Sequence, residues 1–483
     1  MEKVDIRLDK LVLRNYKGFY TGDDENGVEI TFDKNLTVLI GDNGSGKSAV
    51  LDAIALFLGK LRSEITNVGE TASVYPFPMA SNEKKNKDVN NETQSSKLDA
   101  FFNLQPQLIW ENENEDVKRI PKIGFTIEML KAQSPSKIDD SKWYDHSKIG
   151  IEEFDNNTND KKTLDYFLQD NIHDPLSTGE FKDLDKSVPV LVFYGANSIN
   201  TDTSGELDEV ENTVFDTYGD ALDANKFSFK QFFVWFDYQQ KREAQSIWDT
   251  EAEKDNITQS QIKFVADAIK DMLNDNTTEY KNLRVDWSRY PIEMVLTKKN
   301  KKTEIESKLL FSQLSSGERT LIALIADLTR RLCLANPNAK NPLNGNGILL
   351  IDEIDVHLHP KWQQKVVTKL REVFPNIQFV VTTHSPLVLN NIYSKHIRSI
   401  ENGKIYGVSD TFGHDDADDM LRIMGVKSDT REKIKEIHRL LRENKIEEAK
   451  AIRTGITTEG TFAPLLEIDL FIKRKERISH ETY

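Results

Sequence analysis

The feature that constrains this chain most is the octapeptide GDNGSGKS from Gly41 to Ser48, which stands between a predicted strand and a predicted helix. It fits the pattern G-x-x-x-x-G-K-[ST], in which a glycine-rich loop lets backbone N–H groups surround phosphate oxygens at a helix N-terminus. Lys47 is then expected to reach the β- and γ-phosphates of ATP, and the Ser48 hydroxyl to bind Mg²⁺. The residues expected to contact the nucleotide are Asn43, Gly44, Ser45, Gly46, Lys47, Ser48 and Ala49.

The segments around this loop decide between a phosphate site and a chance glycine-rich turn. LTVLI at 36–40 is a short continuous apolar run, as expected of a strand buried on both faces. AVLDAIALFLGK at 49–60 has the apolar spacing of a helix. Because the strand and the helix are both in place, we favour the phosphate-binding loop and an α/β fold with a parallel-sheet core.

The composition excludes several classes of protein. The chain has 483 residues with 64 Lys+Arg against 79 Asp+Glu, and its net charge of −15 argues against a surface coated in nucleic-acid-binding patches. No run approaches the roughly 20 apolar residues of a membrane span, and the charged start MEKVDIRLDK does not fit a signal peptide. The single cysteine, Cys333, excludes an intrachain disulfide and a cysteine-built zinc site. We therefore expect a cytoplasmic protein without a membrane partner.

Hydrophobic periodicity divides the chain into five predicted segments. Residues 1–60 form the N-terminal lobe with the phosphate-binding loop, and residues 61–187 form an insertion, expected to be helical, with a mobile polar loop near 81–97. A strand and helical lobe at 188–309 precedes the rest of the core at 310–410 and a small helical region at 411–483. The predicted strands are 11–16, 28–32, 36–40, 123–130, 188–195, 292–297, 305–311, 347–352, 377–383 and a pair at 396–408. The predicted helices are 49–60, 227–245, 257–275, 316–334, 360–374 and a hairpin at 428–453 with Asn444 at its turn.

A second motif, ILLIDE at 348–353, is a buried-strand pattern that ends in two acids. Alone it is weak, because an acidic pair often simply ends a strand. After a phosphate-binding loop it gains weight, since nucleotide sites form at the carboxyl ends of parallel strands. Asp352 is expected to hold Mg²⁺, and Glu353 to polarise the water that attacks the γ-phosphate.

Two further motifs follow a helix start and a strand end. LSSGER at 314–319 opens a predicted helix, where Ser315 and Gly317 suit a terminal phosphate, although Ser315 or Ser316 can equally serve as an ordinary N-cap. FVVTTHSP at 379–386 places His384 directly after a predicted strand. A lone histidine in this position is more often structural. Because it follows the three motifs at 41–48, 314–319 and 348–353 along the chain, we favour a catalytic role for His384.

The four motifs in this order resemble the ABC-type ATPases, a group that includes RecF, the SMC proteins and the OLD-type ATPases. The resemblance implies an ABC-ATPase head that forms a homodimer or higher oligomer head to head. ATP bound to Lys47 and Ser48 of one chain would be capped by Ser315 and Gly317 of the other, and hydrolysis would be coupled to opening and closing. The opening LVLRNYKGF is similar to that group's first strand and turn, which implies that Asn15 to Phe19 lie near the nucleotide base.

Three longer stretches narrow the resemblance. Residues 326–337, 351–364 and 374–386 are similar to a bacterial group of predicted ATP-binding proteins involved in virulence and to the PtuA ATPases of Septu antiphage systems, also found beside retrons. HLHP at 357–360 is shared with OLD-like ATPases and differs from the Ala-Leu-Asp-Pro-like turn of transporters. The Q-loop glutamine stays open between Gln105, Gln107, Gln133 and Gln169.

The C-terminal region carries acids but no predicted nuclease centre. His414 and the acidic residues Asp415, Asp416, Asp418 and Asp419 lack the strand-end placement of a metal-binding nuclease site, so a solvated helix start is the better interpretation. The Septu resemblance therefore implies that a separate HNH nuclease, PtuB-like, does the cutting. A retron reverse transcriptase with its DNA is a further implied partner, and nucleic acid would be bound through the complex.

Three other functions compete with an antiphage regulator. A RecF-like repair ATPase would bind DNA itself, and it needs a basic surface such as the turn with Lys298, Lys299, Lys301 and Lys302. The second basic run, Lys473, Arg474, Lys475 and Arg477, is more simply a solvated helix face. A structural sensor with little turnover fits poorly with intact Glu353 and His384. A transporter ATPase lacks a clear coupling segment for a membrane partner.

Overall fold

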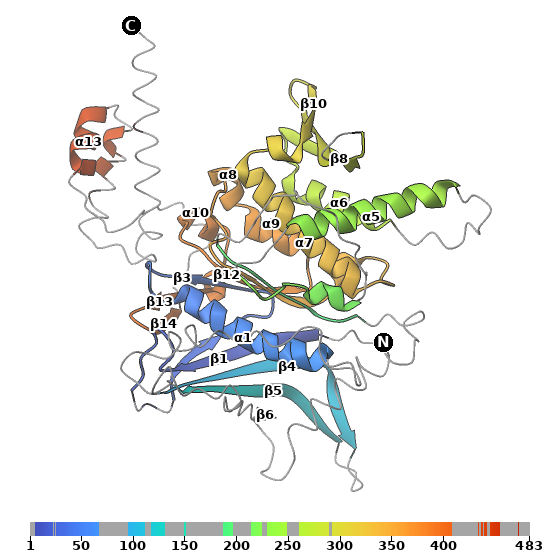
Figure 1. Cartoon of the computed structure of the whole chain (residues 1–483). Helices are drawn as coiled ribbons and strands as arrows, with labels where there is room; N and C mark the ends of the chain where they lie inside the picture. Colours follow the sequence, from blue (N-terminus) through green and yellow to red (C-terminus); the bar gives the residue numbers. More distant parts are fainter. Residues whose placement is uncertain are drawn as a thin grey trace, which may run out of the picture.

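Three β-sheets organise the part of the chain that the computed structural model describes (Figure 1). The helix α1 (Lys47–Thr66) lies between a six-stranded and a five-stranded sheet, and a group of helices covers the opposite face of the six-stranded sheet. One hydrophobic core extends over these layers. The described residues are 5–22, 24, 26–66, 95–111, 117–130, 149–150, 187–196, 214–224, 229–248, 260–288, 292–407, 433, 436–437, 439–441, 445–454 and 472.

The six-stranded sheet has the order β14-β13-β3-β12-β11-β7, with every pair parallel except the β14 edge. Its central strands are buried along their whole length, which explains their continuous apolar sequences. The predicted α/β fold with a parallel core and an antiparallel edge is therefore confirmed. The strands are β3 (Leu36–Ile40), β7 (Val190–Tyr194), β11 (Gly347–Ile351), β12 (Ile377–Thr382), β13 (Ile397–Glu401) and β14 (Lys404–Gly407).

The five-stranded sheet is antiparallel, with the order β2-β1-β4-β5-β6. Every second residue of one stretch of β4 (Leu98, Ala100 and Phe102) is buried, since that face packs against α1. The side chain of Gln378 in β12 joins this sheet to the central one, accepting from Leu8 N at 2.8 Å and donating to Leu8 O at 2.7 Å. The remaining bounds are β1 (Asp5–Arg14), β2 (Val28–Thr31), β4 (Ser95–Glu111), β5 (Val117–Leu130) and β6 (Ile149–Gly150).

The described residues of the segment 61–187 are the end of α1, the strands β4, β5 and β6, and Ser187. Strands thus occupy the described part of the insertion, where the sequence suggested helices, and the rest of the segment lies outside the described residues. The expected strand at 123–130 belongs to the longer β5, while residues 95–97 of the expected loop belong to β4. The rest of that loop lies outside the described residues. The helices of the middle of the chain come later, between 229 and 273.

The helices over the central sheet surround α7 (Ser316–Ala335), which is buried over most of its length. The segment predicted as one helix at 360–374 is two, because Lys365 interrupts it with a φ of −118°. A three-stranded antiparallel sheet, β10-β9-β8, stands beyond these helices, and β8 was not predicted. The other elements here are α5 (Phe229–Trp248), α6 (Gln261–Leu273), α8 (Pro360–Gln363), α9 (Val366–Val373), α10 (Pro386–Leu389), β8 (Thr278–Asp286), β9 (Glu293–Asn300) and β10 (Glu306–Leu310).

A buried ionic network fixes α7 to β7. Asp327, Arg330 and Arg331 are each at most 3% exposed, and Asp327 pairs with Arg330 at 3.0 Å and with Arg331 at 2.7 Å. The Tyr194 hydroxyl donates to Asp327 Oδ2 at 2.8 Å, while the Tyr194 carbonyl accepts from the Asp352 N–H at 2.8 Å. The network therefore connects α7 to the strand ends that carry the acidic motif.

The C-terminal region is described only in part. The helix α13 (Ile446–Thr454) overlaps the second half of the predicted hairpin at 428–453. A separate small apolar cluster in this region includes Ile437, Leu440 and Ala449. Asn444, His414 and the acidic run at 415–419 lie outside the described residues. Among the helices of the described ranges, none combines the length and the apolar character that crossing a membrane requires. The division into five segments stays a prediction.

Candidate nucleotide site

The loop from Gly41 to Gly46 leaves the carboxyl end of β3 and enters α1, as its sequence pattern predicts. Gly41 has a φ of +148°, and a Cβ there would lie 2.3 Å from the Ile400 carbonyl oxygen of β13. Gly46 has a φ of +110°, and a Cβ there would lie 2.8 Å from the ring of Phe19. Both positions therefore exclude any larger side chain, for reasons of space and of backbone conformation.

Lys47 is the first residue of α1, and its side chain turns back over the loop. Its ammonium donates to the carbonyl oxygens of Gly41 at 2.9 Å and Asp42 at 2.8 Å. The side chain is buried, and this burial lowers the pKa of Lys47, although the nearby carboxylates of Asp352 and Asp42 oppose the shift. The loop thus holds a positive charge in a position with little water to screen it.

Asp352 joins the loop to the neighbouring strands. Its Oδ2 accepts a hydrogen bond from Ser48 Oγ at 2.9 Å, and its Oδ1 accepts one from Thr382 Oγ1 at 2.6 Å. Asp352 follows β11 and Thr382 ends β12, so the parallel order of β3, β12 and β11 brings the three residues together. A hydroxyl and a carboxylate side by side are hard oxygen ligands, and this donor set fits Mg²⁺.

Glu353 has an unusual backbone conformation for a residue with a side chain. Its φ is +51°, which costs on the order of 1–3 kcal/mol, and its N–H donates to Thr382 Oγ1 at 2.7 Å. Partial burial raises the pKa of Glu353, and the charges of Asp352 and Asp355 add to this shift while Lys47 opposes it. A carboxylate with a raised pKa, held next to the Asp352 carboxylate, suits a role as a general base.

Asp355 positions the segment that carries His384. Its Oδ1 accepts hydrogen bonds from Thr383 Oγ1 at 2.5 Å and from the His384 N–H at 3.2 Å. Burial lowers the pKa of His384, and the charge of Lys47 lowers it further. The histidine is therefore expected to be neutral near pH 7. Neither Asp355 nor Thr382 was among the predicted site residues, although Asp355 is the third acid of the sequence IDEID.

Ser315 and Gly317 stand at the N-terminus of α7. Ser315 is the N-cap, and its hydroxyl accepts from Glu318 N at 3.3 Å and donates to Glu318 Oε2 at 2.8 Å. A Cβ on Gly317 would lie 2.6 Å from the carbonyl oxygen of His357, so the helix end packs directly against the loop that follows β11. Among the described residues, neither has a hydrogen bond to the loop at 41–49. Ser315 is thus the N-cap of α7, as one of the two interpretations predicted. Its contact with ATP bound to a partner chain stays a prediction.

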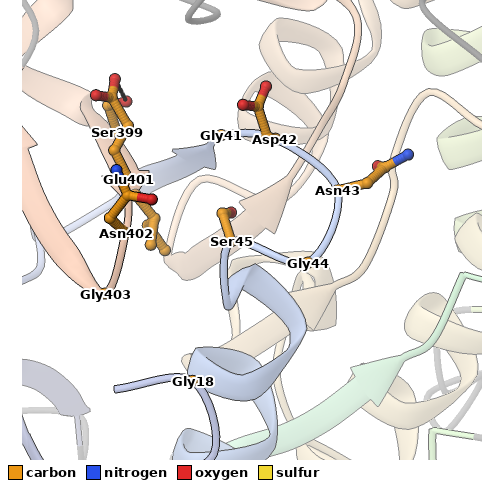
Figure 2. A pocket seen from close by; sticks show the side chains of 11 residues that line it. Gly18, Gly41, Asp42, Asn43, Gly44, Ser45, Ser399, Glu401, Asn402 and Gly403 are labelled. Atoms are coloured by element: carbon orange, nitrogen blue, oxygen red, sulfur yellow. Dashed lines mark hydrogen bonds between the residues drawn. The ribbon is translucent and has the colours of Figure 1, made fainter. Parts of the chain in front are cut away.

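A cavity of about 480 Å³ opens between the phosphate-binding loop and the β13–β14 turn (Figure 2). Gly18 also lines it, so the turn at Asn15 to Phe19, expected near a nucleotide base, does lie beside the loop. Asn15 shapes that turn with a φ of +53° and accepts at its Oδ1 from the N–H groups of Thr21 and Gly22, both at 3.0 Å. The cavity is thus built from three segments that are far apart in the sequence.

The remaining candidates lie elsewhere. Gln105 and Gln107 belong to β4, while Gln133 and Gln169 lie outside the described residues, so no Q-loop glutamine is placed at the site. Gln363 is a polar residue near the site that sequence analysis missed, and it accepts from Ser385 Oγ at 2.8 Å. Ser385 follows His384 directly, so Gln363 contributes to holding that segment.

Comparisons with known proteins point in the same direction. The family model described as "AAA domain, putative AbiEii toxin, Type IV TA system" matches residues 36–390. The "Retron Ec83 probable ATPase" of Escherichia coli is 29% identical over 84% of this chain and 73% of that protein. The "Retron Vc95 probable ATPase" of Vibrio cholerae is 30% identical over 82% of this chain and 73% of that protein.

Two weaker likenesses are more local or more distant. The "Septu protein PtuA" of Bacillus mycoides is 44% identical over 79 residues, which is 16% of this chain and 11% of that protein. The SMC head domain from Thermotoga maritima superposes with a TM-score of 0.34 at 15% identity, over 83% of this chain and 99% of that one. The predicted resemblance to retron-associated and Septu ATPases is confirmed by the relatives in sequence.

Proposed function

We propose that this chain, which belongs to the AAA domain family whose model matches residues 36–390, binds and hydrolyses ATP as the regulatory subunit of an antiphage defence complex. The observation that carries the ATPase part is the convergence of Ser48, Asp352 and Glu353 at the carboxyl ends of neighbouring parallel strands. The defence part is supported by the relatives named as retron ATPases and as Septu PtuA.

Each residue of the site has a proposed role. The N–H groups of Asn43 to Ala49 and the ammonium of Lys47 bind the phosphates, in place of the carbonyl contacts that Lys47 makes now. Ser48 and Asp352 hold Mg²⁺, which neutralises charge on the β- and γ-phosphates. Glu353 orients and polarises the attacking water, and the neutral His384 contacts the γ-phosphate.

The proposed assembly is a dimer of heads, or a higher oligomer built from it. Ser315 and Gly317 at the N-terminus of α7 would cap ATP bound to the partner chain, where backbone N–H groups and the helix dipole favour a phosphate. Glu318 engages the Ser315 N–H at 2.9 Å and its hydroxyl at 2.8 Å, so these donors must be released when the partner's phosphate arrives. Closure would thus be coupled to the state of the nucleotide.

The proposed effector is a separate HNH nuclease of the PtuB kind in the cytoplasm. A retron reverse transcriptase with its DNA is a proposed third component, supported by the two retron-associated relatives that each match over 73% of their length. In this arrangement the chain contributes nucleotide-dependent control, and nucleic acid is bound through the complex.

The RecF-like alternative is less well supported, because part of the charge of its basic turn is already paired. Among the lysines of the turn at 298–302, Lys298 pairs with Glu318 at 2.5 Å and Lys299 pairs with Glu304, while Lys301 donates to the Asp275 carbonyl at 2.8 Å. Two of the four ammonium groups are thus paired with carboxylates of the chain, which reduces the positive charge that this turn offers to a DNA backbone.

Copurification with the native neighbouring genes tests the proposal, because the effector is expected on another chain. A tagged chain is expressed together with those genes, and the proteins of the stable complex are identified by mass spectrometry. A stoichiometric HNH-type nuclease is the expected result. A lone ATPase that retains DNA would overturn the effector hypothesis in favour of DNA repair.

The ATPase part is tested separately with Lys47→Ala, which should abolish ATP binding. Lys302→Ala is the matched control, since Lys302 is an exposed lysine in the turn beyond β9 and does not belong to the phosphate-binding loop. Equal ATP binding by both variants would contradict the assignment of Lys47.

A further inference from the structure

The cavity beside the phosphate-binding loop has a second wall that the sequence motifs do not include. This wall is the β13–β14 turn, which we define as Ser399 to Gly403 (Figure 2). The phosphate-binding loop forms the opposite wall with residues 41–45, and Gly18 lies at the lower end of the view. The cavity measures about 480 Å³, which is enough for a nucleoside.

The β13–β14 turn is packed against the nucleotide site and not merely near it. The Ile400 carbonyl oxygen lies so close to Gly41 that a Cβ at Gly41 would be 2.3 Å away. On its other side, a Cβ at Gly403 would lie 3.0 Å from the Gly18 carbonyl oxygen. The β13–β14 turn therefore contacts both the phosphate-binding loop at Gly41 and the N-terminal turn at Gly18. These two contacts fix how far the turn stands from the loop.

The strand order indicates which end of a nucleotide enters this cavity. β13 and β12 flank β3 on opposite sides, and β12 and β11 carry Thr382 and Asp352 at their ends. In the proposed site the γ-phosphate and the cation lie beside Asp352, at the end of β11. The triphosphate chain would then run from there across the carboxyl end of β3. The nucleoside then leaves the loop on the β13 side, where the cavity lies.

The negative charge of the cavity lining indicates which chemical group of a nucleotide can bind there. Glu401 and Asp42 both line the cavity, so a phosphate group would meet two carboxylates and is disfavoured there. Hydrogen-bond donors are favoured instead. The Ser399 hydroxyl donates to Glu401 Oε1 at 3.1 Å, which orients this carboxylate, and both oxygens retain lone pairs.

The cavity also holds a buried polar atom with an unmet hydrogen bond. Ser45 Oγ is inaccessible to solvent and has no hydrogen-bond partner among the described residues, although Ser45 lines the cavity. Buried hydroxyls without a partner are uncommon, because each forfeits the interaction it had with water. A polar ligand in the cavity would satisfy it only after the Ser45 side chain rotates toward the cavity.

We propose that the β13–β14 turn is the nucleoside-specificity wall of the ATP site, with the Glu401 carboxylate accepting a hydrogen bond from a donor group of the nucleoside. The donor is a ribose hydroxyl or the amino group of the base, which share this chemistry. The proposal rests on the proposed function, since it concerns the same nucleotide. It assigns discrimination to a segment more than 350 positions beyond the phosphate-binding loop in the sequence.

Calorimetric titration with four probes in the presence of Mg²⁺ tests the proposal. The probes are ATP, 2′,3′-dideoxyadenosine triphosphate, inosine triphosphate and inorganic tripolyphosphate, applied to the wild type and to Glu401→Gln. Dideoxyadenosine triphosphate lacks both ribose hydroxyls, inosine triphosphate has a carbonyl in place of the amino group, and tripolyphosphate lacks the nucleoside. Glu372→Gln is the matched control, since Glu372 is an exposed residue of α9 paired with Lys369.

The expected result is that Glu401→Gln weakens ATP binding about tenfold and leaves tripolyphosphate binding unchanged. In the wild type, either dideoxyadenosine triphosphate or inosine triphosphate should bind about tenfold more weakly than ATP. Weaker binding of the first identifies a ribose hydroxyl as the donor, and weaker binding of the second identifies the amino group of the base. That preference should shrink in Glu401→Gln, whose neutral amide oxygen is a weaker acceptor than the carboxylate, and persist unchanged in Glu372→Gln.

Two results would overturn the inference while leaving the ATP site intact. In the first, Glu401→Gln weakens ATP and tripolyphosphate equally, which means that the turn only supports the loop. In the second, Glu401→Gln binds all four probes as the wild type does. A wild type that binds neither ATP nor tripolyphosphate would overturn the proposed function itself.

Discussion

The carboxylate of Asp352 accepts a hydrogen bond from the Ser48 hydroxyl at 2.9 Å, although 304 positions separate the two residues in the chain. This contact joins the first turn of α1 to the end of β11. Both groups are oxygen ligands suited to Mg²⁺, so the direct bond occupies the position in which a cation would be shared between them. The Ser48 hydroxyl is therefore expected to matter for nucleotide binding only when Mg²⁺ is present.

Ser48→Ala removes the hydroxyl that the proposed Mg²⁺ site requires. We expect binding of ATP with Mg²⁺ to weaken about tenfold, while binding of ATP in excess chelator changes little. Calorimetry under both conditions measures the difference. Ser63→Ala is the matched control, because Ser63 lies in the same helix and donates only to the Lys60 carbonyl, at 2.7 Å. Equal losses with and without Mg²⁺ would contradict a cation-binding role for Ser48.

Thr382→Val tests the shared hydroxyl between the two acids. Thr382 Oγ1 donates to Asp352 Oδ1 and accepts from the Glu353 N–H, so its loss leaves a partly buried donor and a partly buried acceptor without this partner. We expect a loss of about 1–3 kcal/mol in the free energy of unfolding, together with a lower kcat. Denaturant unfolding and steady-state ATPase assays measure the two effects. Thr382→Ser keeps the hydroxyl, and a Val variant that matched it in both assays would show that the hydrogen bonds contribute nothing.

Glu353→Gln removes the proposed general base and keeps the shape of the side chain. We expect ATP binding to persist while the hydrolysis rate falls by roughly 10²–10⁴-fold, so that ATP is retained in a closed dimer. Light scattering with ATP measures the dimer, and phosphate release measures turnover. Hydrolysis at the wild-type rate by Glu353→Gln would show that the base has been assigned wrongly.

The carboxylate of Glu318 gives a prediction about pH. Burial alone would raise the pKa of Glu318, but hydrogen bonds from Lys298, Tyr280 and Ser315 outweigh it and lower the pKa to about 2. A carboxylate whose pKa falls on folding stabilises the folded state above its unfolded pKa. This stabilisation is lost as the pH falls from about 4.5 through the folded pKa.

Glu318→Gln measures that contribution directly. The wild type should be more stable than Glu318→Gln at pH 7, and the difference in unfolding free energy should shrink steadily as the pH is lowered toward 3. Denaturant unfolding at a series of pH values gives the difference. Glu304→Gln is the matched control, since Glu304 is 69% exposed in its ion pair with Lys299. A difference for Glu318→Gln that did not depend on pH would contradict the lowered pKa.

The sequence was sufficient to predict the central sheet and the convergence of the main motifs. Parallel strands place their carboxyl ends on one edge, so the motifs after 36–40, 347–352 and 377–383 had to meet there. The supporting contacts were not predictable in the same way. Asp355 and Thr382 act through hydrogen bonds across neighbouring strands, and no spacing in the chain specifies such a partner.

The strands that were missed have identifiable local irregularities. β4 contains Pro106 and a register shift between Asn103 and Leu108, which interrupts the alternation that marks a strand. β8 contains Asn282 with a φ of +56° next to another register shift. The β13–β14 turn was expected as an edge, but its place beside the loop depends on the order of the strands and on close backbone contacts at Gly41.

The ionic network at α7 restricts how this part of the chain can change in evolution. One carboxylate, Asp327, balances two fully buried guanidinium groups, and Arg331 also donates to the carbonyls of Thr217 and Gly219. Replacing Asp327 leaves both guanidinium groups without a counter-charge in a dry interior, which is strongly destabilising. Replacing one arginine still leaves a balanced pair with Asp327, and replacing all three by apolar residues need not be destabilising. Descendants of this sequence are therefore expected to keep Asp327 as long as either arginine stays buried, so that the arginines are lost before the aspartate.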